Sequence, residues 1–270
     1  MRPDSEYQAV LDLIRAGLND CAISRETGIP RTTIRDWRHL GQRGLDERQR
    51  QRLDPTCPLC GTANLDPWWY AYLLGLYLGD GCLSEYRRRV FRLRIFLDLK
   101  YPIIISECKQ AISAMRPART MAIGRSMKIG CVEVHADWKH WPCLFPQHGP
   151  GPKHLRRIQL RQWQEGIAQT YPHRLLRGLI HSDGSRFINR VNGTDYPRYL
   201  FTNHSPDIRQ IFCRACDDFG ISWRQSRWNS ISVARSPDVA KLDLVVGPKT
   251  QPAPITPPLS RRSRVKPLPH

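Results

Sequence analysis

Two short segments of the chain share an order of residue types that could bind a metal ion. Leu73 to Gly81 and Leu176 to Gly184 each read as an apolar helix that ends in Asp-Gly, with Asp80 in the first copy and Asp183 in the second. The glycine is expected to give a left-handed exit from the helix. An aspartate at a helix C-terminus faces the negative end of the helix dipole, which costs about 0.3–1 kcal/mol. Two such aspartates also repel each other when they meet, and divalent cations would relieve both penalties. One Asp-Gly alone is more simply a helix-ending turn, but the pair favours a shared metal site.

Small residues four positions apart indicate how these two helices could meet. Gly75 and Gly79 in the first copy correspond to Gly178 and Ser182 in the second. Each pair falls on one helix face, so we expect the helices to pack backbone against backbone along a pseudo-twofold axis. Four leucines of the same helices are expected to pack into the core of each half-domain: Leu73, Leu76, Leu176 and Leu179.

Each segment leads into the same series of predicted elements. The first is followed by a strand in which Arg92, Arg94, Phe96 and Asp98 alternate with Leu93, Ile95, Leu97 and Leu99. A helix over 104–115 and a hairpin over 121–135 come next. The second is followed by strands over 186–191 and 198–203, a helix capped by Ser205, and a hairpin over 221–235. Each copy therefore reads helix, two strands, helix, two strands, and the chain contains an internal duplication.

The two segments resemble the paired LAGLIDADG motifs of single-chain homing endonucleases, and the resemblance covers roughly residues 68–247. It implies an α+β fold with a duplicated αββαββ core, whose two antiparallel sheets form a saddle over DNA. It also implies that Asp80 and Asp183 are catalytic and share two or more Mg²⁺ ions in hydrolysis of both DNA strands. The other acidic position of the motif holds Leu78 and His181. That position is not a metal ligand in the family, and His181 is expected to pack or to support the site from behind.

The resemblance assigns roles to further residues. A basic residue often lies near the metal ions in this family, and Lys128 and Lys241 are the candidates, with Lys128 assigned to catalysis. Outward-facing strand residues would contact DNA in the major groove: Arg92, Arg94, Arg198, Ser222 and Arg224. Any one of them would also suit a solvated strand face, but their shared sign favours DNA.

Residues 6–40 read as three short helices, the third from Arg31 to Leu40. The spacing of Ile23, Ser24, Gly28, Ile29, Ile34 and Trp37 resembles a helix-turn-helix. The other face of the third helix would meet phosphates and base edges through Arg31, Thr32, Thr33, Arg35 and Arg38. A generic three-helix unit is the alternative.

These patterns divide the chain into six parts. A small all-α helix-turn-helix domain over 1–42 is followed by a basic linker over 43–67, which could begin as a helix. The first repeat over 68–146 and the second repeat over 172–247 are joined by a connector over 147–171. A Pro- and Arg-rich tail over 248–270 is expected to be disordered.

Composition restricts the partners. The 42 Lys and Arg residues outnumber the 24 Asp and Glu residues and give a net charge of +18, which indicates a phosphate-rich partner, double-stranded DNA. The longest apolar stretch, Trp68 to Gly79, is 12 residues, against the roughly 18 that a membrane span needs. The N-terminus lacks the apolar segment of a signal peptide, so we expect an intracellular, cytoplasmic and nucleoid-associated protein. The internal twofold predicts a monomer.

The nine cysteines include two Cys-x-x-Cys pairs, Cys57 with Cys60 and Cys213 with Cys216. The first pair lies in a turn-like segment that would suit zinc, but its neighbourhood supplies no second ligand pair. Cys143, His148 and His154 are more distant candidates to complete it. Ordinary thiols are therefore favoured over a structural Zn²⁺ site at Cys57 and Cys60.

Two functions remain open. The leading one is a metal-dependent, site-specific DNA endonuclease. The alternative is a non-cleaving transcription regulator on the same scaffold, as in WhiA-like proteins. There the helix-turn-helix is C-terminal and the acidic pair is typically lost, whereas here it is N-terminal and both aspartates are present.

Overall fold

The computed structural model describes residues 2–52, 57–86, 89–115, 124–128 and 130–250. The expected tail lies outside these residues, apart from its first three positions. The chain divides into two compact units, residues 1–64 and 65–270. Among the described residues, no helix is both long enough and apolar enough to cross a membrane.

The described residues of the first unit form the helices α1 (Asp4–Arg15), α2 (Asp20–Thr27) and α3 (Arg31–Arg52). The side chain of Asn19 accepts a hydrogen bond from the Ala22 amide and caps α2, which ends at Gly28 in the left-handed conformation with φ 68°. The core contains all four residues expected to hold the helices together, Ile23, Ile29, Ile34 and Trp37. The Tyr7 ring packs at a tilt against the Trp37 ring, with 4.6 Å between the ring centroids.

The third helix is longer than the predicted Arg31 to Leu40. It continues to Arg52 after a non-helical residue, Gly41, whose φ of 51° suits glycine. The Arg-, Gln- and Glu-rich residues that follow are good helix formers, and this explains why the helix resumes.

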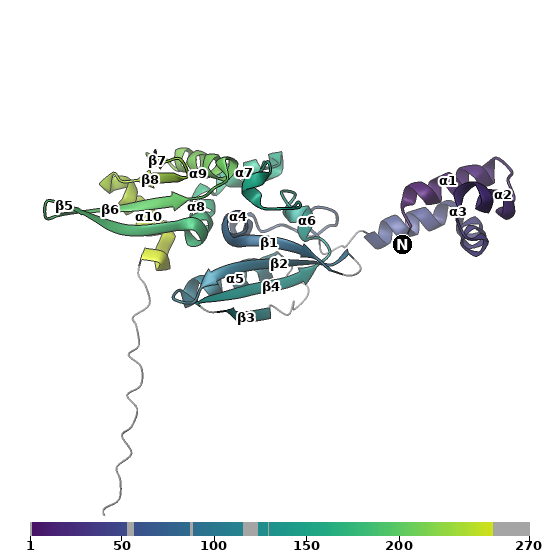
Figure 1. Cartoon of the computed structure of the whole chain (residues 1–270), viewed down its shortest axis with the longest axis horizontal. Helices are drawn as coiled ribbons and strands as arrows, with labels where there is room; N and C mark the ends of the chain where they lie inside the picture. The colour runs from purple at the N-terminus through teal and green to yellow at the C-terminus, as the bar shows by residue number, and fades with distance from the viewer. Residues whose placement is uncertain (1, 53–56, 87–88, 116–123, 129, 251–270) are drawn as a thin grey trace, which may run out of the picture. The chain divides into compact units, whose positions relative to one another are not determined.

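The second unit holds the two repeats. The first consists of α4 (Pro67–Asp80), β1 (Gly81–Glu85), β2 (Phe91–Asp98), α5 (Pro102–Ala114), β3 (Gly124–Lys128) and β4 (Cys131–Trp138). The second consists of α8 (Pro172–Asp183), β5 (Gly184–Val191), β6 (Thr194–Thr202), α9 (Pro206–Asp218), β7 (Arg224–Arg227) and β8 (Ser230–Val233). The predicted α+β fold with two antiparallel sheets is confirmed, and Figure 1 shows the two sheets.

The two sheets have the same strand order, β1-β2-β4-β3 and β5-β6-β8-β7. The predicted alternation in β2 is present: Leu93, Ile95 and Leu97 are buried, and the residues between them are partly exposed. In the second sheet, Tyr199 and Phe201 are buried, and Phe201 stacks on Phe212 of α9 at 4.3 Å. In each sheet, therefore, one face packs on helices and the other is available to a partner.

A helix follows the fourth strand of each repeat. These are α6 (Trp141–Leu144) after β4 and α10 (Ser236–Val246) after β8. The 3₁₀ turn η2 (Lys153–Leu155) and helix α7 (Gln162–Thr170) then lead to the second repeat, and the 3₁₀ turn η3 (Gly247–Thr250) follows α10.

Helices α4 and α8 pack on each other through glycine, as the spacing predicts. A Cβ on Gly75 would lie 2.6 Å from the Leu175 carbonyl oxygen, and a Cβ on Gly178 would lie 3.0 Å from the Gly75 Cα. The neighbours are backbone atoms that cannot rotate away. The contact therefore depends on the absence of side chains at these two positions.

This contact predicts the effect of adding one methyl group. We expect Gly178→Ala to lower the free energy of unfolding by about 3 kcal/mol, since overpacking against rigid backbone is costly. The matched control is Gly166→Ala in α7, where a Cβ meets nothing within 4 Å, so that alanine should be neutral or stabilise by up to about 1 kcal/mol. Thermal melts of the two variants give the comparison, and equal melting temperatures would contradict the described packing.

Candidate active site

The two helices of the central contact each end on an aspartate. Asp80 is the last residue of α4 and Asp183 is the last residue of α8. The glycines that follow do not make the predicted left-handed exit, because Gly81 and Gly184 both have a φ of −94°. Glycine is needed there for space instead: a Cβ would lie 2.5 Å from the Tyr77 Cα or 2.6 Å from the Ile180 Cα. Each strand can thus begin directly against the helix that precedes it.

Burial and proximity set the electrostatics of the two carboxylates. Burial raises the pKa of Asp80 to about 6, with a further contribution from the charge of Asp183. Burial also raises the pKa of Asp183. Lys153 and Lys249 act in the opposite direction on both groups. The pair is therefore a site where negative charge is held at a cost and where added positive charge would be stabilising.

Two lysines cap the ends of these helices. Lys153 Nζ donates to the carbonyl oxygens of Leu78 at 3.0 Å and Gly79 at 2.9 Å, and also to that of Tyr77. Lys249 Nζ donates to the carbonyl oxygens of His181 at 2.8 Å and Ser182 at 3.2 Å. A cation at a helix C-terminus is favourable. Burial lowers the pKa of Lys153 to about 8, and it also lowers the pKa of Lys249.

Sequence reasoning missed both lysines, although the chain holds a signal for them. Lys153 ends the tripeptide Gly151-Pro152-Lys153, and Lys249 ends Gly247-Pro248-Lys249. Both glycines have positive φ, 76° at Gly151 and 69° at Gly247, and both tripeptides adjoin a 3₁₀ turn. The same short motif, with its glycine at positive φ in both copies, follows each repeat and places a lysine at the end of its helix.

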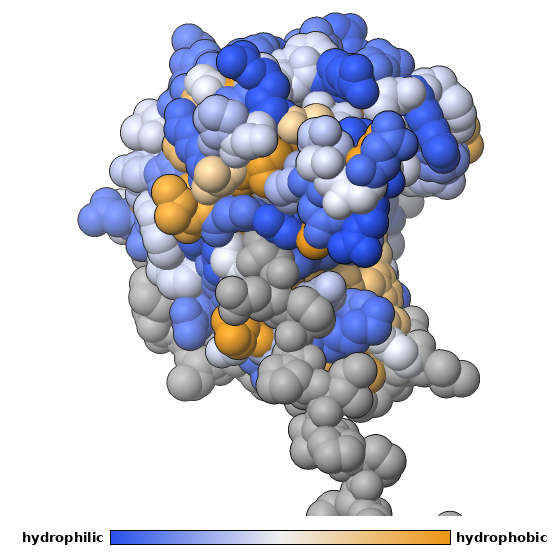
Figure 2. All heavy atoms as spheres, turned by 90° about the vertical axis from the view of Figure 1, so that its left-hand side faces the viewer, coloured by the Kyte–Doolittle hydropathy of each residue, from blue (hydrophilic) through white to orange (hydrophobic). Residues whose placement is uncertain are grey.

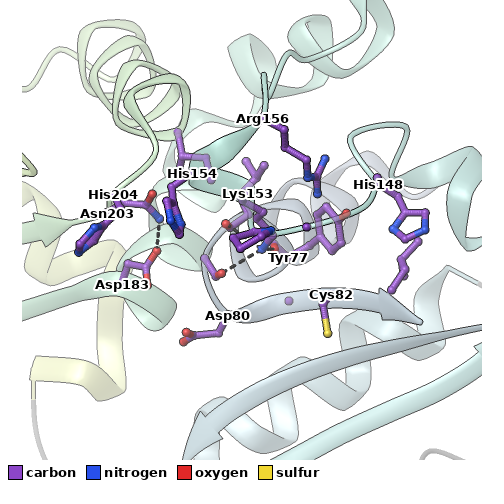
Figure 3. A pocket seen from close by; sticks show the side chains of 18 of the residues that line it. Tyr77, Asp80, Cys82, His148, Lys153, His154, Arg156, Asp183, Asn203 and His204 are labelled. Atoms are coloured by element: carbon purple, nitrogen blue, oxygen red, sulfur yellow. Dashed lines mark hydrogen bonds between the residues drawn. The ribbon is translucent and has the colours of Figure 1, made fainter. Parts of the chain in front are cut away.

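An open cavity of about 1150 Å³ contains both aspartates in its lining. Figure 3 shows Lys153 at the end of α4, and His154, Asn203 and His204 on the side of Asp183. Asn203 Nδ2 donates to Asp183 Oδ2 at 2.5 Å. In the first repeat, the strand register places the buried Leu97 at the position that corresponds to Asn203. The two halves of the site therefore differ: among the residues that the structure describes, a side-chain amide holds Asp183 but none holds Asp80.

The two positions where the sequence departs from the acidic motif are both buried. Leu78 lies in the core. His181 Nδ1 lies 2.9 Å from the Tyr72 hydroxyl, and His181 Nε2 lies 2.7 Å from the Val246 carbonyl oxygen. Burial lowers the pKa of His181 to about 3, so the ring is neutral near pH 7. His181 is buried behind the site and contacts the Val246 carbonyl oxygen at the end of α10.

The lysines that the sequence suggested lie elsewhere. Lys128 is the last residue of the outer strand β3, opposite Cys131 in the register. Lys241 lies in α10 and donates to the Phe219 carbonyl oxygen, at the C-terminal end of α9. Lys241 therefore caps a different helix, and the lysines that reach Asp80 and Asp183 are Lys153 and Lys249.

The arginines expected at DNA lie on exposed faces, but several are already paired. Arg92 makes two hydrogen bonds of 2.7 Å with Asp137, and Arg94 lies 3.4 Å from Glu133. In the first unit, Arg38 pairs with Asp20 at 2.8 Å. The remaining expected contacts are at least partly exposed: Arg31, Thr32, Thr33, Arg35, Arg198, Ser222 and Arg224.

The residues at the helix ends suit a hard divalent cation. Aspartate oxygens are the donors that Mg²⁺ and Mn²⁺ accept, and the raised pKa values show that these oxygens lack full compensation for their charge. A structural zinc site at Cys57 and Cys60 stays a hypothesis. The other Cys-x-x-Cys pair, Cys213 and Cys216, is buried in α9, as expected for ordinary thiols.

No family model matches the chain, and no curated protein matches its sequence. Its structure is similar to solved structures with the LAGLIDADG fold. The homing endonuclease I-DmoI in complex with DNA and Mn is 16% identical, with 67% of this chain and 96% of that chain covered and a TM-score of 0.44. I-WcaI bound to its DNA recognition sequence is 14% identical, with 68% and 83% covered and a TM-score of 0.41. The N-terminal LAGLIDADG domain of DUF199/WhiA is 14% identical, with 67% and 81% covered and a TM-score of 0.37.

The raised pKa of Asp80 predicts how stability depends on pH without metal. Its pKa of about 6 exceeds the ordinary value near 3.8, so the folded protein binds more protons than the unfolded chain between these values. Stability should therefore fall as pH rises from about 4 to 6. Asp80→Asn should raise the free energy of unfolding at pH 7.5 in EDTA by about 1–3 kcal/mol, and the gain should vanish near pH 4.

The control is Asp218→Asn, because Asp218 is also the last residue of a helix but is exposed. That variant should gain only the helix-dipole contribution, at most about 1 kcal/mol. Urea unfolding of the three proteins across the pH range measures the difference. A wild-type protein that loses stability as pH falls from 6 to 4, with no gain from Asp80→Asn at pH 7.5, would contradict the described electrostatics.

Proposed function

We propose that the protein is a divalent-metal-dependent endonuclease that cuts double-stranded DNA at a specific site. The observation that carries the proposal is the pair of partly buried aspartates at the ends of two packed helices, each end capped by a lysine from a repeated Gly-Pro-Lys segment. A purely structural role does not account for this arrangement, because burying two neighbouring carboxylates costs stability.

Asp80 and Asp183 would hold the metal ions, and Mg²⁺ is the proposed ion. When bound there, the ions would activate a water molecule and stabilise the leaving 3′ oxygen of each strand. Lys153 and Lys249 would keep positive charge beside the carboxylates and the incoming phosphates. Asn203 would fix the Asp183 carboxylate, and His181 would fix the end of α10, which the turn η3 with Lys249 follows.

The DNA would lie on the exposed faces of the two sheets, which carry Arg92, Arg94, Arg198 and Arg224. Base edges in the major groove are accessible to two-stranded ribbons and sheets. The exposed face of α3 in the first unit would add contacts through Arg31, Thr32, Thr33 and Arg35. The net charge of +18 supports a polyanionic partner of this size.

The test first selects a target site from a random DNA library. It then measures how fast the variants Asp80→Asn and Asp183→Asn cut that site. Each substitution keeps the shape of the side chain and removes one charged ligand. We expect each variant to lose cleavage of at least one strand by 100-fold or more, while its affinity for the site in Ca²⁺ changes only a few-fold. Nicking and linearisation of a plasmid that carries the site, with Mg²⁺, give the readout.

Two outcomes would decide against the proposal. If both variants cut as well as the wild type, the aspartates are not part of a nuclease site. If the wild type binds its selected site tightly but never cuts it, the non-cleaving DNA-binding regulator takes the place of the endonuclease. Asp218→Asn serves again as the control, and it should cut normally.

The lysine caps can be tested in the same assay. Lys153→Met and Lys249→Met should each slow cleavage by about 10- to 1000-fold, since charge next to the reacting phosphate is lost. The matched control is Lys241→Met, which removes a similar cap from the carbonyl at the end of α9. All three variants should lose some stability, but only the first two should lose cleavage at a temperature where each is folded. Equal cleavage by all three would mean that the lysines serve only as helix caps.

A further inference from the structure

We propose that the two sheets recognise half-sites of unlike composition, the first sheet reading G·C pairs and the second reading A·T pairs. This inference rests on the proposed function, because it requires that the exposed faces of the sheets lie in the major groove. It follows from a difference between the two faces in charge and in apolar surface.

The exposed face of the first sheet carries arginines that are held by carboxylates of the neighbouring strand. Arg92 in β2 lies directly opposite Asp137 in β4, and the two side chains make a fork of two 2.7 Å hydrogen bonds. This contact lowers the pKa of Asp137. Arg94 lies 3.4 Å from Glu133 and donates to the Tyr86 hydroxyl at 2.8 Å. The arginines are thus fixed before any partner arrives.

An arginine beside a carboxylate matches the major-groove edge of a G·C pair. Guanine presents two acceptors, O6 and N7, and cytosine presents a donor, its N4 amino group. The guanidinium of Arg92 has further N–H groups for guanine, and the carboxylate of Asp137 has further lone pairs for cytosine. Both groups are partly exposed, with 27% and 45% of their side-chain surface accessible. An A·T pair presents its two acceptors, adenine N7 and thymine O4, on either side of the adenine N6 donor, so it offers the arginine no adjacent pair of acceptors.

The exposed face of the second sheet has a different character. Alternation along β5 and β6 places Phe187, Asn189, Val191, Tyr196 and Arg198 on the side away from the buried Tyr199 and Phe201. Phe187, Val191 and Tyr196 are 40%, 46% and 48% exposed. The carboxylate of β6, Asp195, lies on the opposite side with its partner Arg190. Figure 2, which views the molecule from the side where Figure 1 shows β5 and β6, shows apolar patches among polar side chains.

This second face matches A·T pairs. An asparagine can bond adenine at N6 and N7, and apolar side chains contact the thymine methyl group. Asn189 lies opposite Tyr196 in the register, and Phe187 lies opposite Arg198. Polar and apolar side chains that could contact base edges therefore alternate along the hairpin. Within the described strands β5 to β8, this face offers no carboxylate to accept the cytosine amino group. Arg198 and Arg224 on this face could still bond guanine, but no carboxylate of these strands would accept from cytosine, so a G·C pair would gain less here than on the first sheet.

The experiment selects bound sites from a random duplex library in Ca²⁺ with the full-length protein and sequences them. We expect one half-site enriched in G·C and the other in A·T. Arg92→Ala should reduce the preference for G·C about tenfold at one or two positions of the first half only. Arg92→Lys should do the same while retaining more affinity, because it keeps the charge but loses the fork. Asn189→Ala and Phe187→Ala should reduce the preference for A·T in the other half only.

The matched control is Arg190→Ala. Arg190 makes the same forked contact with Asp195 that Arg92 makes with Asp137, but on the side of its sheet that faces away from the proposed DNA. Its selected site should equal that of the wild type. Half-sites of equal composition, or relaxation by Arg190→Ala as large as by Arg92→Ala, would overturn the inference and leave the nuclease proposal standing. Failure to select any site would instead count against DNA recognition itself.

Discussion

The close packing of α4 on α8 is the constraint on which the rest of the second unit depends. Because Gly75 and Gly178 have no side chains, the two helices meet backbone against backbone. Both helices run to an aspartate, so the same contact brings two carboxylates and two helix C-termini into one place. Each of these groups is negative or partly negative, and bringing them together is unfavourable. The surrounding structure supplies the compensation.

That compensation comes from segments outside the two motifs. Lys153 arrives from the connector between the repeats, and Lys249 arrives from the segment that follows α10. Each cation satisfies the carbonyl oxygens that a helix leaves unpaired at its C-terminus and lowers the pKa of the nearby carboxylates. Compensation is incomplete, since the pKa of Asp80 still lies near 6. A site that retains uncompensated negative charge is prepared for further cations, and this is the physical basis of the proposed metal chemistry.

The duplication, the strand faces and the glycine contact could be predicted because they leave periodic signals in the sequence. Leu93, Ile95 and Leu97 alternate, and Gly75 and Gly178 recur at matching places. The lysines at the site could not be predicted that way. Lys153 and Lys249 lie far along the chain from the aspartates and are positioned by tertiary contacts, whereas the sequence pointed to Lys128 and Lys241. The pairing of Arg92 with Asp137 was missed for the same reason, since only the register of β2 on β4 places them opposite each other.

The most direct test of the central claim is a crystal structure of the protein bound to its selected DNA with Mn²⁺, using anomalous scattering to locate the metal. The account predicts Mn²⁺ peaks within coordination distance of carboxylate oxygens of both Asp80 and Asp183, next to the phosphates to be cut. An anomalous map with no peak at either carboxylate, in a complex where the DNA lies across the two sheets, would contradict it.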